Sequence, residues 1–226
     1  MTQGFLKAVN RAEREFSPAV IFDVGANLGQ STELFSSVFP HATIYLFEPA
    51  QATFAILQGK LGSDPRMVLH RLALDQAAGE VKFTGKRGST DNRILRGGET
   101  GEQVEIVKSI TGDAFCAEHK LSEIDILKID TEGNDLRVLV GFVELLRLKR
   151  IKYIQVECTT SPDNRFHVQL DRFMHFLHPF GYRIFGQFEF TRQIFKTKQK
   201  LNGAWFCNAV FVREVENPRL RKEHIN

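Results

Sequence analysis

Residues 19–29, AVIFDVGANLG, contain the pattern that decides the fold. A short apolar run closes on Asp23, a glycine-bearing turn follows, and then comes an amphipathic pattern that ends at Pro40. An apolar run, a tight glycine turn and a helical pattern in this order are typical of a strand, a loop and a helix. We therefore interpret residues 19–40 as the first βα unit of an α/β domain.

The same rhythm repeats along the chain. We expect further strands at residues 42–49, 67–74, 104–111, 123–130 and 151–157, with helices at 52–62, 113–119 and 134–146. Near-continuous apolar strands that alternate with helices call for a parallel sheet covered on both faces. The remainder is expected to form a helix at 170–181 and strands at 182–190 and 204–214. We predict a doubly wound, mostly parallel, Rossmann-like α/β sheet with antiparallel strands at its C-terminal end.

Two segments depart from this rhythm. Residues 1–18 place apolar side chains at helical spacing, and we expect a short amphipathic helix there, ahead of a single domain over residues 19–226. Residues near 79–110 are expected to form a loop or hairpin insertion, because the alternation in EVKFTG is typical of a strand. Within it, residues 85–103 combine five glycines with several charges, which predicts a mobile loop over the site.

Composition fits one globular domain and excludes several classes of protein. The 226 residues are 42% apolar and 25% charged, unlike disordered, collagen-like or disulfide-scaffold chains. The formal net charge of +3 does not require nucleic acid as a partner. The three cysteines are far apart and lack metal-ligand spacing, so a reducing cytoplasm is the simplest compartment. The charged N-terminus does not resemble a secretory signal, and no apolar run approaches the ~20 residues of a membrane span.

Four predicted strands end in an acidic residue: Asp23, Glu48, Asp130 and Glu157. In an open parallel sheet, ligands bind outside the carboxyl ends of the strands. Because burying a lone carboxylate is costly, acids along this edge suggest a polar ligand pocket; the alternative is that these strands simply end at solvent. Glu48 follows the glycine turn at a spacing, roughly 20 residues, from which an acid binds ribose hydroxyls.

The glycine turn is not a phosphate-binding motif. Gly25 and Gly29 permit backbone conformations and close approaches that a Cβ would obstruct, and Ser31 or Thr32 can cap the next helix. The turn lacks the Gly-Lys-Ser/Thr sequence of a P-loop, and its spacing departs from GxGxxG. Taken alone, it favours an ordinary tight βα connection over a ligand site.

Together, four stretches resemble the FkbM-type methyltransferases, a group of S-adenosylmethionine-dependent enzymes that methylate oxygen. They are DVGANLGQST (23–32), the FEP ending (47–49), LALDQAAGEVKF (72–83) and DILKIDTEGNDLRVLVG (125–141). The resemblance covers roughly residues 19–157, and a weaker similarity is present in NAVFVR (208–213). It implies a class I methyltransferase fold, S-adenosyl-L-methionine as cofactor, and a hydroxyl of a sugar, glycan or natural-product precursor as acceptor.

The resemblance also implies a cofactor site. The methionine part would lie against the loop from Asp23 to Ser31, the ribose diol against Glu48, and the adenine against Ala73 and Leu74. The residues so expected at the cofactor are Asp23, Gly25, Ala26, Asn27, Gly29, Gln30, Ser31, Glu48, Pro49, Ala73, Leu74 and Asp130. The 85–103 loop has no clear match in the family, so the resemblance does not identify the acceptor.

Methyl transfer from a sulfonium is an in-line displacement, for which positioning is the main requirement. A hydroxyl acceptor also gains from a base, and we predict Asp130 or Glu132 for this role because like charges so close could raise one pKa. Loop ordering and helix-terminus stabilisation are the alternative roles of these two acids. Glu157 is the second candidate. The same acids could hold Mg²⁺, but no compact ligand motif demands it, and we predict no required metal.

His167, His175 and His178 are expected along a Phe-rich helix, where histidines are more often core-edge or surface residues than bases. Of these, His167 is the candidate base.

Two other functions stay open: an NAD-dependent Rossmann oxidoreductase, and a non-catalytic module that keeps the cofactor pocket. A nucleic-acid methyltransferase is disfavoured, because the sequence has no Asn/Asp-Pro-Pro-aromatic motif and no strongly basic face. The expected partner is a small-molecule or glycan hydroxyl acceptor, without nucleic acid. The sequence leaves the oligomeric state open.

Overall fold

The computed structural model of the chain describes residues 3–86, 92–101, 103–164, 166–194 and 203–214. Within these residues, the strands of the large central sheet are β1 (Val20–Val24), β2 (Thr43–Phe47), β3 (Met67–His70), β7 (Ile124–Ile129), β8 (Ile151–Thr159), β9 (Val168–Gln169), β10 (Tyr182–Ile194) and β11 (Gly203–Arg213). A smaller sheet contains β4 (Ala73–Leu74), β5 (Gly79–Thr84) and β6 (Val104–Ile110).

The helices are α1 (Gln3–Ala12), α2 (Gln30–Val38), α3 (Gln51–Leu61), α4 (Gly112–Glu118), α5 (Asp135–Val140), α6 (Val143–Arg147) and α7 (Leu170–Leu177), followed by the 3₁₀-helix η1 (His178–Phe180). Across the described ranges, no helix combines the length and the apolar character that a membrane crossing needs.

The large sheet has the strand order β10-β11-β8-β7-β1-β2-β3, and β9 pairs with β8. The five strands from β8 to β3 run parallel, whereas β11 is antiparallel to both β8 and β10. The predicted doubly wound, mostly parallel sheet with antiparallel C-terminal strands is therefore confirmed. The strand order reverses beside β1, so the carboxyl ends of β1, β2 and β7 form the edge at which such sheets bind ligands.

Both faces of the sheet are covered, which explains the near-continuous apolar strands. Phe22 and Val24 of β1 belong to the core on the face of α4, α5, α6 and α7. Ile21 belongs to the core on the opposite face, together with Phe35 of α2. Side chains of successive strand residues alternate between faces, and this alternation also fixes where the polar residues of β1 and β7 point.

The N-terminal helix α1 packs on this second face. Its Phe5, Leu6 and Val9 are buried. The Phe5 ring lies 5.6 Å from Tyr153 of β8 and 6.4 Å from Phe185 of β10, measured between ring centroids. The amphipathic pattern of the first residues thus contributes side chains to the same core as β1 and α2.

The predicted extents of one strand and one helix were wrong, because the structure divides each of them. The strand expected at 67–74 is divided between β3 and β4, which belong to different sheets. The helix expected at 134–146 is divided into α5 and α6 at Gly141 and Phe142. A Cβ on Gly141 would lie 2.4 Å from the carbonyl oxygen of Asp75, and the Phe142 side chain is fully buried, so packing against the end of β4 interrupts the helix.

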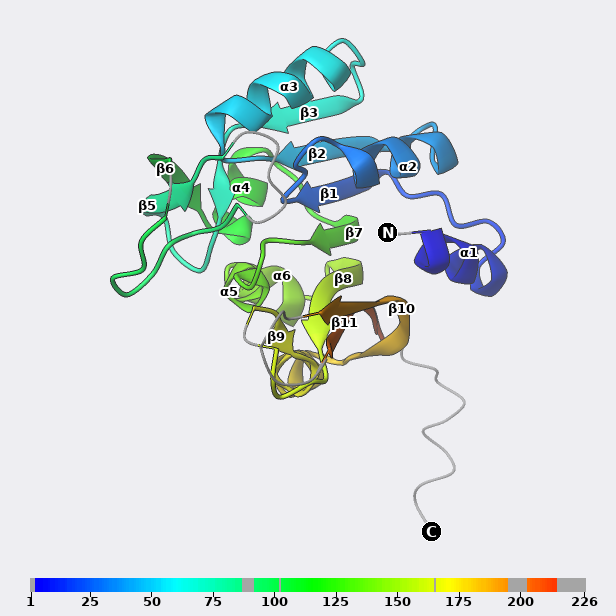
Figure 1. Cartoon of the computed structure of the whole chain (residues 1–226). Coiled ribbons are helices and arrows are strands. Elements are labelled where there is room, and N and C mark those ends of the chain that lie inside the picture. Colours follow the sequence, from blue (N-terminus) through cyan, green and yellow to red (C-terminus); the bar gives the residue numbers. More distant parts are fainter. Residues whose placement is uncertain (1–2, 87–91, 102, 165, 195–202, 215–226) are drawn as a thin grey trace.

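The insertion contributes β5 and β6 to the smaller sheet, which lies beyond the arrowheads of β1 and β2 in Figure 1. β5 and β6 pair antiparallel, and β4 joins β6 in parallel. Ile94 forms an isolated bridge with Phe83 of β5. Of the loop expected at 85–103, residues 87–91 and 102 lie outside the described residues, whereas residues 93–95 lie alongside β5, with backbone hydrogen bonds from Thr84 to Arg93 and from Leu95 to Lys82.

Candidate active site

A cavity opens at the carboxyl ends of β1, β2 and β7, beneath the smaller sheet. Ten of the twelve residues that the sequence suggests for a cofactor line it: Gly25, Ala26, Asn27, Gln30, Ser31, Glu48, Pro49, Ala73, Leu74 and Asp130. Glu132 also lines it, while Asp23, Gly29 and Glu157 do not. The insertion adds Phe83, Asn92 and Ile94, which the sequence reasoning did not single out.

The glycine turn forms one wall of the cavity and needs its first glycine. Gly25 has a φ of +77°, and a Cβ there would lie 1.9 Å from the carbonyl oxygen of Asp130. The backbone N–H groups of Gly25 and Ala26 both donate to the carbonyl oxygen of Phe47, at 3.0 Å. The turn is therefore clamped between β2 and β7. Gly29, with a φ of +82°, packs instead against Leu57 and Leu61 of α3 and begins α2.

Glu48 joins the second strand to this turn. Its Oε1 accepts a hydrogen bond from the Ala50 N–H at 2.8 Å, and its Oε2 accepts one from the Asn27 N–H at 3.0 Å. The residue is only 5% exposed, and this burial raises the pKa of its carboxyl to about 7, against the lowering effect of the two hydrogen bonds and of Lys128. A buried, oriented carboxyl that ionises near neutrality thus faces the cavity.

Asp23 lies beneath the turn rather than on the cavity. It is fully buried, accepts a hydrogen bond from the Thr32 hydroxyl at 2.6 Å, and pairs with the Lys128 ammonium at 2.9 Å. Lys128 in turn lies 3.3 Å from Asp130 and donates to the carbonyl oxygen of Gly25 at 3.3 Å. Burial opposes its charge, but Asp23 and Asp130 hold the pKa of Lys128 above its ordinary value.

Lys128 is a site residue that the sequence reasoning missed. It lines the cavity and links two of the acids that end the predicted strands. The available signal was a lysine inside the apolar run ILKI, because lysine is almost never fully buried unless it is paired.

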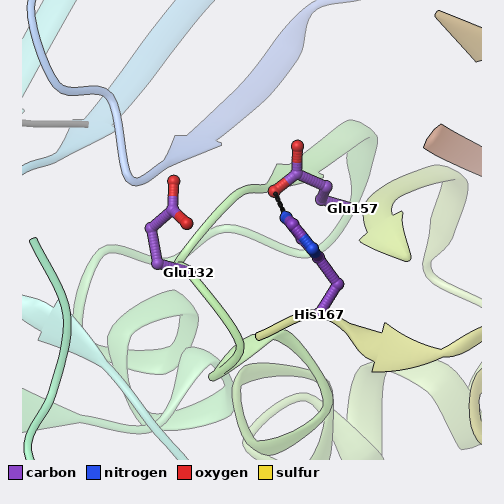
Figure 2. A group of neighbouring side chains, drawn as sticks. All are labelled: Glu132, Glu157 and His167. Atoms are coloured by element: carbon purple, nitrogen blue, oxygen red, sulfur yellow. Dashed lines mark ion pairs between the residues drawn. The ribbon is translucent and has the colours of Figure 1, made fainter. Parts of the chain in front are cut away.

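The other acids gather on the far side of Asp130, together with His167. Glu132 follows β7 with a φ of +52°, Glu157 lies on β8, and the His167 Nε2 lies 2.8 Å from a Glu157 carboxylate oxygen. Figure 2 shows Glu132 approaching the Glu157–His167 pair, and one ligand atom from each of the three residues lies within 4.8 Å of the others.

His167 does not lie on the helix expected for it. It directly precedes β9, whereas His175 lies on α7 and His178 begins η1. Its Nδ1 lies 2.9 Å from the Asn164 amide nitrogen, and its ring stacks on Phe206 of β11 with centroids 4.4 Å apart. His167 is thereby buried and held in one orientation at the edge of the site.

Asp135, at the start of α5, is a second residue that the sequence reasoning missed. It is buried; its carboxylate accepts hydrogen bonds from the Thr131 hydroxyl at 2.9 Å and from the Glu157 N–H at 3.3 Å. Burial raises the pKa of Asp135 to about 7, and the charges of Asp130 and Glu157 add to this effect. Asp130, Asp135 and Glu157 are therefore close enough to influence one another's ionisation.

The insertion is tied to the site through Asp75, which directly follows β4. The guanidinium groups of Arg96 and Arg137 lie 2.6 and 3.1 Å from the Asp75 carboxylate. Burial opposes the charge of this group, but Arg96 and Arg137 hold the pKa of Asp75 below its ordinary value. Arg96 also donates to Asn134, which lines the cavity. These contacts connect the described part of the insertion to α5.

A protein-family model described as the methyltransferase FkbM domain matches residues 23–184. The chain belongs to the FkbM methyltransferase family. The match runs from β1 into β10 and includes every residue that lines the cavity. The family resemblance seen in the sequence is confirmed.

Two curated relatives illustrate the family. The chain is 25% identical over 147 residues to the hexuronic acid methyltransferase AglP of Haloferax volcanii, covering 63% of this chain and 58% of that protein. It is 29% identical over 174 residues to the 31-O-demethyl-FK506 methyltransferase FkbM of Streptomyces tacrolimicus, covering 61% of this chain and 64% of that one. The chain thus spans about three fifths of the length of each of these two relatives.

Among solved structures, the precorrin-6y C5,15-methyltransferase of Geobacter metallireducens matches the fold with a TM-score of 0.51 at 12% identity. The match covers 95% of this chain and 90% of that chain. The FkbM-family chain therefore has the class I methyltransferase fold, as the sequence predicted.

Proposed function

We propose that this chain is an S-adenosylmethionine-dependent O-methyltransferase that acts on a hydroxyl of a sugar, glycan or natural-product acceptor. The observation that carries the proposal is Glu48, a buried carboxyl hydrogen-bonded to the glycine turn and facing the cavity. A carboxylate in this position, at the end of the strand after a glycine turn, is suited to accept hydrogen bonds from a ribose diol.

The cavity offers a surface for each part of the cofactor. The turn at Gly25, Ala26 and Asn27 lines the cavity, with small residues at its first two positions, and suits the methionine part. Ala73 and Leu74 provide an apolar surface for the adenine, and Phe83 of the insertion lies on the same cavity. S-adenosylmethionine supplies the electrophilic methyl group, so the protein must orient the acceptor oxygen and accept its proton.

Asp130 and Glu132 are the acids on the cavity wall that could accept this proton. Lys128 holds Asp130 in place through their ion pair, and Glu132 is directed by the positive φ of its backbone. Glu157 lies beside Glu132, paired with His167, and does not line the cavity. We infer that Asp130 or Glu132 serves as the base and that Glu157 acts from behind them.

The acceptor class is inferred from relatives. AglP is named for a hexuronic acid, and FkbM of S. tacrolimicus for the 31-O position of a natural product. The first name gives a sugar acid as acceptor and the second specifies an oxygen atom, which agrees with an acid-lined site that can activate a hydroxyl. The described part of the chain carries no feature that would select one acceptor among these.

Binding of S-adenosylhomocysteine tests the cofactor site. Isothermal titration calorimetry should show one site per chain, and Glu48→Ala should weaken binding by about 1–3 kcal/mol through loss of charge-assisted hydrogen bonds. Glu33→Ala is the matched control, because Glu33 is an exposed acid paired with Lys60 outside the cavity. Unchanged affinity in the Glu48 variant would remove this residue from the site.

The two alternative functions predict different results. An NAD-dependent oxidoreductase should be stabilised against heat by NAD(P) and not by S-adenosylhomocysteine. A non-catalytic module should bind S-adenosylhomocysteine yet methylate no member of a panel of hydroxyl acceptors. For an active enzyme, Asp130→Asn should lower turnover more than cofactor affinity, and equal losses would assign Asp130 to binding.

A further inference from the structure

We propose that Glu132, Glu157 and His167 bind a divalent first-row transition-metal ion beside the methyl-transfer cavity. Its position in the site rests on the proposed function, because Glu132 is the ligand that reaches the cavity wall. The three side chains come from three separate segments: the loop after β7, the strand β8, and the residues before β9 (Figure 2).

The spacing of the ligand atoms fits one ion. One atom from each residue lies within 4.8 Å of the other two. Bonds of about 2.0–2.4 Å from a central ion to each ligand allow separations up to about this value. Two carboxylates and one neutral imidazole also balance the charge of a divalent cation, and this mixture of oxygen and nitrogen ligands suits Mn²⁺ and Fe²⁺ better than Ca²⁺.

The histidine is prepared to act as a ligand. His167 is 9% exposed, and its Nε2 faces Glu157 while its Nδ1 faces Asn164. The Asn164 side chain presents its amide nitrogen at 2.9 Å and its amide oxygen at 3.2 Å from Nδ1. Nδ1 therefore has a partner in either tautomer, including the one that frees Nε2 for a metal. Metal-bound histidines usually have such a partner on the second nitrogen.

The backbone holds Glu132 against the histidine segment. Glu132 has a φ of +52°, which is uncommon for a residue with a side chain, and Gly133 follows with a φ of +92°. A Cβ on Gly133 would lie 2.3 Å from the carbonyl oxygen of Phe166, directly before His167. The loop after β7 and the His167 segment thus touch through their backbones, and this contact places Glu132 opposite Glu157.

The surrounding charge favours a cation. Besides Glu132 and Glu157, the carboxyl groups of Asp130 and Asp135 lie on the same side of the site. Asp135 accepts a hydrogen bond from the Glu157 N–H at 3.3 Å, so a further carboxyl group lies directly beside the proposed ligands. A divalent ion between Glu132 and Glu157 would offset the negative charge of these carboxylates. Under this assignment Glu132 and Glu157 are ligands, and Asp130 is left as the base.

The test is Mn²⁺ binding to the full chain after removal of metals with EDTA and dialysis. Free Mn²⁺ is measured by electron paramagnetic resonance, with and without S-adenosylhomocysteine. We expect one saturable site per chain, and at least a tenfold loss of affinity in both His167→Ala and Glu157→Gln. His175→Ala is the matched control, since His175 is exposed on α7, and it should bind Mn²⁺ as the unaltered chain does.

A milder variant keeps the test valid if a ligand substitution prevents folding. Asn164→Ala keeps the three ligand side chains but removes the partner of Nδ1, together with the acceptor of the Phe166 and His167 N–H groups, and it should weaken Mn²⁺ binding about 10- to 100-fold. The proposal is overturned if the unaltered chain shows no saturable site, or if affinity persists in all three variants. Binding of S-adenosylhomocysteine without Mn²⁺ binding would refute the metal site alone, whereas Mn²⁺ binding without S-adenosylhomocysteine binding would refute the proposed cofactor.

Discussion

The pH dependence of cofactor binding should follow the ionisation of Glu48. Its carboxyl is buried, and this burial raises the pKa to about 7. A ribose diol donates two hydrogen bonds, which the carboxylate accepts and the protonated acid cannot both accept without losing its own proton. Binding of S-adenosylhomocysteine to the acid form must therefore include the cost of deprotonating Glu48.

The size of the effect follows from this pKa. A group with a pKa of about 7 is about 3% ionised at pH 5.5 and about 75% ionised at pH 7.5, so the dissociation constant should fall about 25-fold, or about 2 kcal/mol, over this range. Because the pKa of Glu48 is raised to about 7, the affinity for S-adenosylhomocysteine should decrease as the pH falls through 7. Two charged side chains near Glu48 also affect its pKa: Lys128 favours ionisation of the carboxyl, and Glu105 opposes it.

The assay is calorimetric titration of S-adenosylhomocysteine at several pH values from 5.5 to 7.5. Glu48→Gln is the matched variant, because it keeps the size of the side chain and cannot ionise. It should bind more weakly than the unaltered chain at pH 7.5 and show a flat pH profile. If the dissociation constant of the unaltered chain changes less than twofold over this range, the reasoning is refuted. If Glu48→Gln keeps a steep profile, the pH dependence belongs to another group, such as Asp135, whose pKa is also raised to about 7.

Two further predictions concern the stability of the fold, both measured by urea unfolding. Lys128→Met should lower the free energy of unfolding by about 3–5 kcal/mol, because it leaves Asp23 buried and unpaired, whereas Lys60→Met at an exposed pair should change it by less than about 1 kcal/mol. Phe5→Ala should cost about 3–5 kcal/mol by leaving a cavity between α1 and β8. An unchanged unfolding midpoint in Phe5→Ala would show that the packing of α1 does not stabilise the domain.

The sheet and the Glu48 side of the site follow from local sequence signals. An apolar run followed by an acid gives both a strand and the position of its carboxyl end, and parallel strands bring these ends to one edge. Glu48 lies on the cavity for this reason. The extents of the strand expected at 67–74 and of the helix expected at 134–146 could not be predicted, because both depend on segments distant in sequence. The strand divides where β4 leaves β3 to pair with β6, and the helix divides where Gly141 meets Asp75.

The direction of Asp23 was predictable in principle from the same pattern. Side chains alternate along a strand, and Asp23 therefore shares the face of Ile21, which packs toward α2. Lys128 shares the face of Ile126 by the same rule, and the parallel register pairs Asp23 with Lys128 across β1 and β7. Acids at strand ends thus divide into two kinds: Glu48, which follows its strand and reaches the cavity, and Asp23, which lies within its strand and supports the turn from below.

The two halves of the site are built from different kinds of segment. This difference decides which properties of the relatives can be expected in this chain. The proposed cofactor side is made by β1, β2 and the turn at Gly25, whose backbone donates to the carbonyl oxygen of Phe47 and leaves no room for a Cβ beside Asp130. The opposite side is made by connecting segments, with Asn92 and Ile94 from the insertion. Sheet geometry constrains the first half, while loops tolerate change. Identities of 25–29% to relatives named for different acceptors are compatible with one shared cofactor chemistry, and we expect the insertion, whose Asn92 and Ile94 line the cavity, to contact the acceptor.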